Sequence, residues 1–182
     1  GVESYKTGDG DVVKGHSSNI AGKNKIQPDN LIYTNKDINA LMANTTAAGN
    51  TGLGYQALKT NTEGHSNVAV GKNSLKLGTT GDYNVAVGMN ALDANTTADN
   101  NTAVGYDALG ANTTGTGNVA VGTNALDANT TANNNTAVGK AALGANTTGA
   151  DNVAIGAVAL DANTTGDNNT AVGQQALGSN TT

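Results

Sequence analysis

The feature that most constrains this chain is a strict 17-residue period. An Asn followed four residues later by Gly recurs without insertion at Asn50, Asn67, Asn84, Asn101, Asn118, Asn135, Asn152 and Asn169. Counting this Asn as repeat position 1, Leu occupies position 9 in every one of these copies. Because each copy then meets an identical neighbour, the copies are expected to stack along one axis. We therefore predict an all-β fold, a repetitive β-roll or β-solenoid with 17-residue coils.

The repeats do not extend over the whole chain. Residues 37–46 read DINALMANTT and align with GMNALDANTT at residues 88–97, so the array begins in mid-repeat near Asn39. We divide the chain into an N-terminal cap or connector, residues 1–38, and the repeat array, residues 39–182. Residues 30–42 have enough apolar side chains to dock onto the first coil and cap it, which an open solenoid end requires. The start at Gly1 without Met and the end inside a repeat indicate a fragment or a processed product.

Each copy divides into a strand and a segment of undecided structure. Positions 1 to 5 read Asn-Thr/Val-Ala-Val-Gly, in which the β-branched residues favour a short strand. The Gly that ends it can adopt a backbone angle that other residues avoid. In positions 6 to 14, Ala and Leu favour a helical turn, whereas Asn, Thr and Gly favour a turn or a second short strand. Leu at position 9 and Val, Leu or Ile at position 4 are the residues predicted to be buried.

From Asn84 onward, two repeat positions alternate between successive copies. Position 2 alternates between Val and Thr, and position 10 between Asp and Gly, so the complete unit is 34 residues long. Duplication of a two-copy block explains this pattern. A packing difference between adjacent coils is the alternative.

The apolar content of one coil is small, with one Leu, one or two Val and several Ala. This is too little burial to offset the conformational entropy lost in ordering a lone, thin solenoid, so association with other copies is expected. Position 3, on the strand face opposite position 4, holds Ala69, Ala86, Ala103, Ala120, Ala137, Ala154 and Ala171. Such a row of Ala is suited to a crowded axis between chains, although a solvated face could also carry it.

Composition excludes several classes of protein. The 182 residues include no Trp, Phe or Cys, which disfavours a conventional globular core and removes disulfides and thiolate metal sites. The net charge is -5 and all nine basic residues are Lys, so no basic stripe is present to bind nucleic acid. The chain has no apolar run long enough to cross a bilayer and no signal-like segment, so we expect no membrane insertion of this segment.

No constellation of catalytic residues is apparent, and we predict that the protein is not an enzyme and has no cofactor. His16 and His65 are isolated from other ligand types and lack metal-binding spacing. Asp93, Asp127 and Asp161 recur two coils apart, which is about 10 Å in a stack and too far for one metal ion to bridge. We therefore expect no metal site, with calcium held between symmetry-related chains as the alternative. The Gly residues lack the spacing of a phosphate-binding loop.

Three further features bear on binding. Asn-Thr-Thr sequons occur at Asn95, Asn112, Asn129, Asn146 and Asn163. We interpret them as turns in which the Asn side chain bonds the backbone, with glycosylation as the alternative. Stacked Thr side chains would form regular rows of hydroxyl and methyl groups, as an ice-binding solenoid requires. Tyr55 and Tyr106 share position 6 and could stack on sugars, but this position varies freely between copies, which indicates an exposed and unspecialised site.

The strand sequence resembles that of known fibres. Asn-Val-Ala-Ile-Gly at residues 152–156, like the copies around it, resembles the head repeats of trimeric autotransporter adhesins. The longer unit N-T-A-V-G-x-x-A-L-x-x-N-T-T-G resembles repeats of bacteriophage tail fibres. The resemblance covers residues 39–182, although this repeat is longer than that of the adhesins and has Thr or Val where they have Ser after Asn. It implies a homotrimer, intertwined or side by side, that winds about a common axis.

The resemblance and the uniform repeat together predict a structural surface fibre, the shaft or head of a tail fibre or adhesin. Its repeats would act as a stiff spacer that holds or presents receptor-binding surfaces for attachment to a host or a cell. The receptor would be a cell-surface glycan or protein, and the expected location is extracellular, on a cell surface or on a virion. The alternative function is an ice-binding solenoid, or another solenoid that binds a ligand along a ladder of identical side chains.

Overall fold

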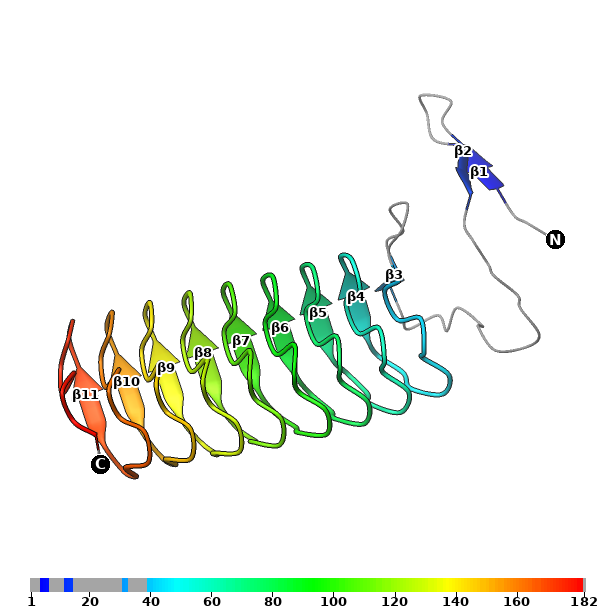
Figure 1. Ribbon diagram of the computed structural model, residues 1–182. Helices are drawn as coiled ribbons and strands as arrows, with labels where there is room; N and C mark the ends of the chain where they lie inside the picture. The colour runs from blue at the N-terminus through cyan, green and yellow to red at the C-terminus, as the bar shows by residue number, and fades with distance from the viewer. Residues whose placement is uncertain (1–3, 7–11, 15–30, 33–38, 182) are drawn as a thin grey trace.

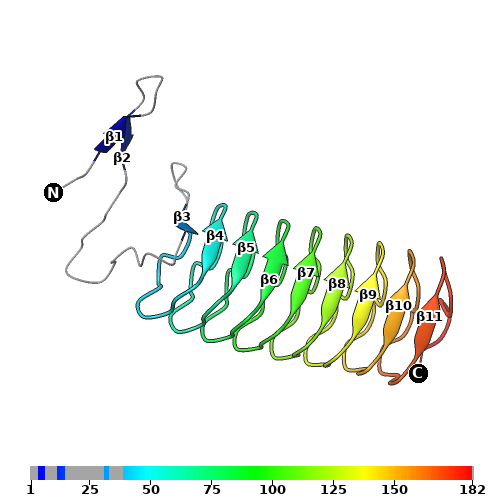
Figure 2. The same cartoon turned by 180° about the vertical axis from the view of Figure 1, so that it is seen from behind.

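A computed structural model describes residues 4–6, 12–14, 31–32 and 39–181; residues 31–32 and 39–181 form a β-solenoid, and none of the described residues is helical (Figure 1). The all-β fold with 17-residue coils, predicted above, is confirmed. Strands β1 and β2 form an antiparallel pair, and β3 to β11 form one nine-stranded parallel sheet in chain order, side by side in both views (Figures 1 and 2). The strands are β1 (Ser4–Lys6), β2 (Val12–Lys14), β3 (Leu31–Ile32), β4 (Thr51–Leu53), β5 (Val68–Val70), β6 (Val85–Val87), β7 (Thr102–Val104), β8 (Val119–Val121), β9 (Thr136–Val138), β10 (Val153–Ile155) and β11 (Thr170–Val172).

Neighbouring repeat strands pair at the spacing of the repeat. Val119 of β8 lies opposite Thr136 of β9, and Ala120 lies opposite Ala137. Backbone bonds between coils continue outside the strands, since the amide of Leu126 donates to the carbonyl of Ala142 at 3.1 Å. Each repeat position therefore sits directly beside its own copies along the whole stack, as a period without insertions requires.

The sheet begins before the repeat array. Leu31 and Ile32 of β3 pair with Thr51 and Gly52 of β4, so the N-terminal segment contributes one strand to the stack. Leu41 is buried, and its amide donates to the carbonyl of the first full coil at Ala57. The capping role expected of residues 30–42 stays a prediction, and residue 30 and residues 33–38 of that segment lie outside the described part of the chain.

The segment after each strand, left undecided by the sequence, is a series of tight turns. In the coil that begins at Asn135, amides donate three residues back: Ala142 to Gly139, Gly144 to Ala141, and Asn146 to Leu143. Positions 9 and 7 adopt a positive φ in every copy from Asn50 to Asn169, for example 51° at Leu143 and 53° at Ala141. The Gly at position 5 also has a positive φ, 134° at Gly139, as the sequence predicted. Leu rarely adopts this conformation, so the surrounding structure must enforce it.

The core of the coils consists of Ala at positions 3 and 8 and Leu at position 9, with Gly52 and Ser74 in place of Ala in the first two full coils. The interior Leu residues are all at most 1% exposed: Leu58, Leu75, Leu92, Leu109, Leu126, Leu143 and Leu160. Their predicted burial is confirmed. The prediction for position 3 was wrong, because Ala69, Ala86, Ala103, Ala120, Ala137 and Ala154 are completely buried inside their own chain and cannot face another one. In a three-residue strand only the middle side chain points inward, and the narrow space beside the Leu column admits only Ala.

The same geometry overturns the predicted burial of position 4. Leu53 is 42% exposed, Val104 36% and Ile155 41%, and the other members of this row are exposed or half-buried. Position 4 follows the inward Ala by one residue and therefore points to the opposite side, away from the core. The sequence pattern located the two faces of the strand correctly but assigned them the wrong way round.

Two columns of buried Asn run through the interior beside the apolar core. At position 1, the backbone amide of Asn118 donates to Oδ1 of Asn101 at 2.9 Å, and its Nδ2 donates to the carbonyl of Ala132 at 2.8 Å. At position 12, Nδ2 of Asn129 donates to Oδ1 of Asn112 at 2.9 Å and to the same Ala132 carbonyl at 3.1 Å. These bonds satisfy side chains that would otherwise make the interior unstable, because a buried amide without partners is costly.

Candidate interaction surface

The outer face of the strands is an uncharged apolar ribbon. It is formed by positions 2 and 4 of β4 to β11, the side chains that flank the buried middle residue of each strand, which is Gly52 in β4 and Ala in the others. We call this surface the outer ribbon. Position 2 contributes Thr51, Val68, Val85, Thr102, Val119, Thr136, Val153 and Thr170, and position 4 contributes Leu53, Val70, Val87, Val104, Val121, Val138, Ile155 and Val172. At a strand spacing of about 4.8 Å, eight strands give a ribbon about 34 Å long.

A bare apolar face of this kind is unusual for a parallel sheet. Parallel sheets are normally covered on both faces, and here the core of the solenoid covers only the inner one. Position 4 holds a β-branched or Leu side chain in every strand from β4 to β11, and no charged residue occurs at position 2 or 4. The outer ribbon is therefore suited to contact with another apolar surface.

The alternation between copies has a packing consequence at position 10. An added Cβ at Gly144 would lie 3.5 Å from Oδ1 of Asp127, and one at Gly178 would lie 3.1 Å from Oδ1 of Asp161. Gly144 and Gly178 thus leave room beside the carboxylate of the preceding coil, whereas a Cβ added at Gly110 would meet Asp107 of its own coil. Asp in every coil would also bring like charges to about 4.8 Å, whereas alternation doubles that separation. At position 2, alternation between Val and Thr changes only the outer ribbon.

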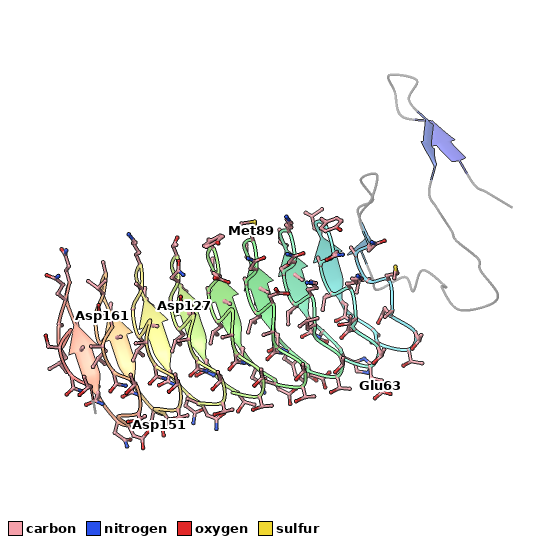
Figure 3. The ribbon with its side chains drawn as sticks, viewed as in Figure 1. Glu63, Met89, Asp127, Asp151 and Asp161 are labelled. Atoms are coloured by element: carbon pink, nitrogen blue, oxygen red, sulfur yellow. The ribbon has the colours of Figure 1, made fainter. Side chains whose placement is uncertain are left out.

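The other two edges of the solenoid carry mixed side chains. Met89 lies at the loop tips along one edge, whereas Glu63 and Asp151 lie along the opposite edge (Figure 3). Position 6, predicted to be exposed, is 42% exposed at Tyr55 and 45% at Tyr106. The two Tyr side chains are three coils apart, so they do not form one stacking platform. Sugar binding at these positions stays a prediction.

Asp93 at position 10 and Asp107 at position 7 both have raised pKa values. Burial raises the pKa of Asp93, with Lys76 opposing and Asp107 adding to the rise. Burial also raises the pKa of Asp107, and Asp127 adds to this shift. Asp127 is held by Nδ2 of Asn124, which donates to its Oδ2 at 2.8 Å. Within the described ranges, no three His, Asp or Glu side chains are grouped so that they could hold a metal ion.

His65 has a structural contact. Its ring is exposed, and its Nδ1 accepts a hydrogen bond from the backbone amide of Ala48 in the neighbouring coil at 3.0 Å. His16 lies outside the described residues.

The Asn-Thr-Thr segments are turns in which the Asn side chain bonds the backbone, as predicted. The five sequon Asn side chains are completely buried, and each Nδ2 donates to a backbone carbonyl three residues on: Asn95, Asn112, Asn129, Asn146 and Asn163. Because Nδ2 is the atom that a glycan would join, these sites are inaccessible in the folded chain.

The two Thr of each Asn-Thr-Thr segment differ in their roles. The first donates its hydroxyl to the next coil, as Oγ1 of Thr113 does to the carbonyl of Thr130 at 3.0 Å. The second is exposed, as at Thr114 and Thr131. The segments therefore present one free Thr column along a bend instead of a flat double row. This column is the feature relevant to ice binding, which stays a prediction.

The part of the chain that the structure describes contains no helix able to span a membrane. Comparisons with protein-family models, with curated proteins and with solved structures found no match to this chain.

Proposed function

We propose that this chain is a structural element of a surface fibre, in which three copies associate through their outer ribbons and form a stiff, non-enzymatic spacer. The observation that carries the proposal is the outer ribbon itself, an uncharged row of Val, Leu and Ile on the uncovered face of a parallel sheet. Covering this row would remove apolar area from water in every coil, and each coil would contribute equally.

Identical coils favour a symmetric assembly. In a cyclic arrangement each ribbon residue faces its own copies on the other chains, so the period of one chain matches that of its partners at every level. The number three comes from the resemblance to trimeric adhesin heads and tail fibres. Only the ribbons would face the axis, leaving the Asp, Thr and Asn of the other two sides in water.

The backbone supports the role of spacer. Each coil bonds to the next through its strand, its turns and the Asn column at position 1, as the amides of Val119, Leu126 and Asn135 illustrate. Bending the rod would have to break several of these bonds at one level. A stiff rod of this kind, outside the cell or on a virion, holds a receptor-binding tip or adhesive surface away from its base. Three chains would also present a weak glycan or protein contact three times.

Light scattering on the purified protein tests the assembly. The chain has a mass of 17.9 kDa, and we expect a particle of about three times that mass. Val121→Lys places a charge in the middle of the outer ribbon and should lower the mass, since three buried ammonium groups would meet at the axis. Thr131→Lys adds the same charge at an exposed position outside the ribbon and should leave the mass unchanged. A folded monomer of the unaltered protein would refute the proposal.

Ice binding is the second candidate, favoured by the exposed Thr column at position 14. Its members are Thr80, Thr97, Thr114, Thr131, Thr148 and Thr165, spaced by one coil each. Thermal hysteresis and the shape of growing ice crystals distinguish the two functions. Clear faceting of ice would contradict the spacer, whereas cell or glycan binding by a longer chain would support it.

A further inference from the structure

The Asn column at position 12 is interrupted at one coil. Between Asn44 and Asn163, each Asn that follows another Asn in this column donates Nδ2 to Oδ1 of the Asn in the preceding coil: Asn61 to Asn44, Asn112 to Asn95, Asn129 to Asn112, Asn146 to Asn129, and Asn163 to Asn146. In the coil that begins at Asn67, position 12 is Gly78 instead. The column therefore lacks one carboxamide between Asn61 and Asn95.

Asn61, in the coil before Gly78, has a side-chain oxygen without a hydrogen-bond partner. Asn61 is 1% exposed, and its Nδ2 donates to Asn44 Oδ1 at 3.3 Å and to Gly64 O at 2.9 Å. Its Oδ1 is thereby turned toward the next coil, where Gly78 has no side chain to donate, and no protein atom bonds it. A buried carbonyl oxygen of this kind calls for a hydrogen-bond donor.

Asn95, in the coil after Gly78, lacks the side-chain acceptor that the other Asn residues of the column have in the preceding coil. Nδ2 of Asn95 donates to the carbonyl of Ala98 at 3.0 Å, as its counterparts do in other coils. Its second usual bond would go to position 12 of the preceding coil, which is Gly78. The break is thus bordered by an acceptor on one side and a donor on the other.

The backbone at Gly78 accepts a Cβ without a clash. A Cβ added there would meet nothing closer than the carbonyl oxygen of Leu75 at 3.4 Å, an ordinary contact distance. At Gly122, by comparison, an added Cβ would lie 2.5 Å from the carbonyl of Gly139. Gly78 is also absent from the residues with positive φ, so its backbone conformation does not require Gly.

We propose that the break at Gly78 is an internal hydration site, in which water replaces the missing carboxamide and links Asn61 to Asn95. One water donates to Oδ1 of Asn61, a second accepts from Nδ2 of Asn95, and the two bond each other. Two molecules are needed because one coil spacing of about 4.8 Å is added to the usual column bond of about 3 Å, so Oδ1 of Asn61 and Nδ2 of Asn95 lie about 8 Å apart, a gap that three hydrogen bonds in series span. Buried water of this kind bonds polar groups that the protein leaves unpaired. The site is independent of the proposed assembly, since it lies inside one chain.

Oxygen-17 relaxation dispersion of water, which detects slowly exchanging internal molecules, tests the proposal on the whole chain. Gly78→Asn restores the carboxamide and should reduce the dispersion amplitude, with a rise in the midpoint of thermal unfolding. Gly78→Ala, the matched control, occupies only the Cβ position and should retain the amplitude. Asn112→Gly makes a second break and should increase it.

An unchanged amplitude in folded Gly78→Asn would overturn the site, as would a midpoint no higher than that of Gly78→Ala. A crystal structure of the unaltered protein at atomic resolution gives a readout that does not depend on any variant. Electron density for water between Asn61 and Asn95 is expected, and a dry gap there would refute the proposal.

Discussion

Replacing Leu126 with Ala measures how much the Leu column contributes to the fold. Leu126 is completely buried in the core cluster that runs through the coils. Its backbone has a φ of 52°, and Ala would experience the same left-handed strain, so the substitution reports mainly the lost side chain. Removing a buried Leu side chain typically costs 2 to 5 kcal/mol, and we expect a loss of about 3 to 5 kcal/mol per chain.

The upper part of this range applies because the coil cannot collapse into the cavity. The amide of Leu126 bonds the carbonyl of Ala142 in the next coil at 3.1 Å, and its carbonyl accepts from Asn129 at 3.1 Å. Moving the backbone inward would break these bonds, so the cavity remains largely open.

Leu177→Ala is the matched control, since Leu177 holds the same repeat position with a φ of 51° but is 50% exposed. Less apolar area is lost there, and we expect less than half the destabilisation of Leu126→Ala. Urea unfolding followed by far-ultraviolet circular dichroism gives both free energies. Equal losses at the two sites, or no loss at Leu126, would refute the assignment of position 9 as the core.

Two further predictions concern the turn glycine and the carboxylates. Gly122→Ala should lower the unfolding midpoint strongly, because φ is 140° and the new Cβ would lie 2.5 Å from the carbonyl oxygen of Gly139. Gly144→Ala is the control and should have a small effect, since the backbone at Gly144 does not have a positive φ. Similar midpoints for the two variants would contradict the strain argument. Asp93→Asn should raise the midpoint of thermal unfolding at neutral pH. Burial raises the pKa of Asp93 in the folded chain, so the ionised carboxylate destabilises the fold once the pH is above this raised pKa, and Asn carries no such charge. The gain should vanish below about pH 3.9, where Asp93 is protonated in both states, and a pH-independent difference would contradict the cause.

The sequence by itself determined the architecture along the axis. A strict 17-residue period without insertions leaves stacking as the only arrangement in which every copy has the same neighbours. It also predicted a short strand within positions 1 to 5, the burial of Leu126 and its equivalents, and the Gly turn. Each of these features depends on local conformational preference or on repetition, and both can be read from one sequence.

The sequence predicted the backbone bonds of one of the two Asn columns and not those of the other. The Asn of the Asn-Thr-Thr segments was expected to bond the backbone, and it does. The role of the Asn at position 1, which accepts from the next coil and donates across its own coil, was not predicted, although its presence in every copy was the signal. An Asn at the start of a strand is equally compatible with an exposed turn, and only the closed cross-section of the coil brings it inside.

Tertiary structure alone decided which strand face is the core. Position 3 and position 4 alternate in the same way whichever side is buried, and the larger side chains of Val104 and Ile155 favoured the wrong choice. The closed coil has room for Leu109 from the turn and only a methyl group from the strand, so Ala103 is buried and Val104 is left outside. Which face is buried depends on the width of the space between the strand and the turn. The positive φ of Leu and the Gly turn set this width, and it cannot be read from the period of the sequence.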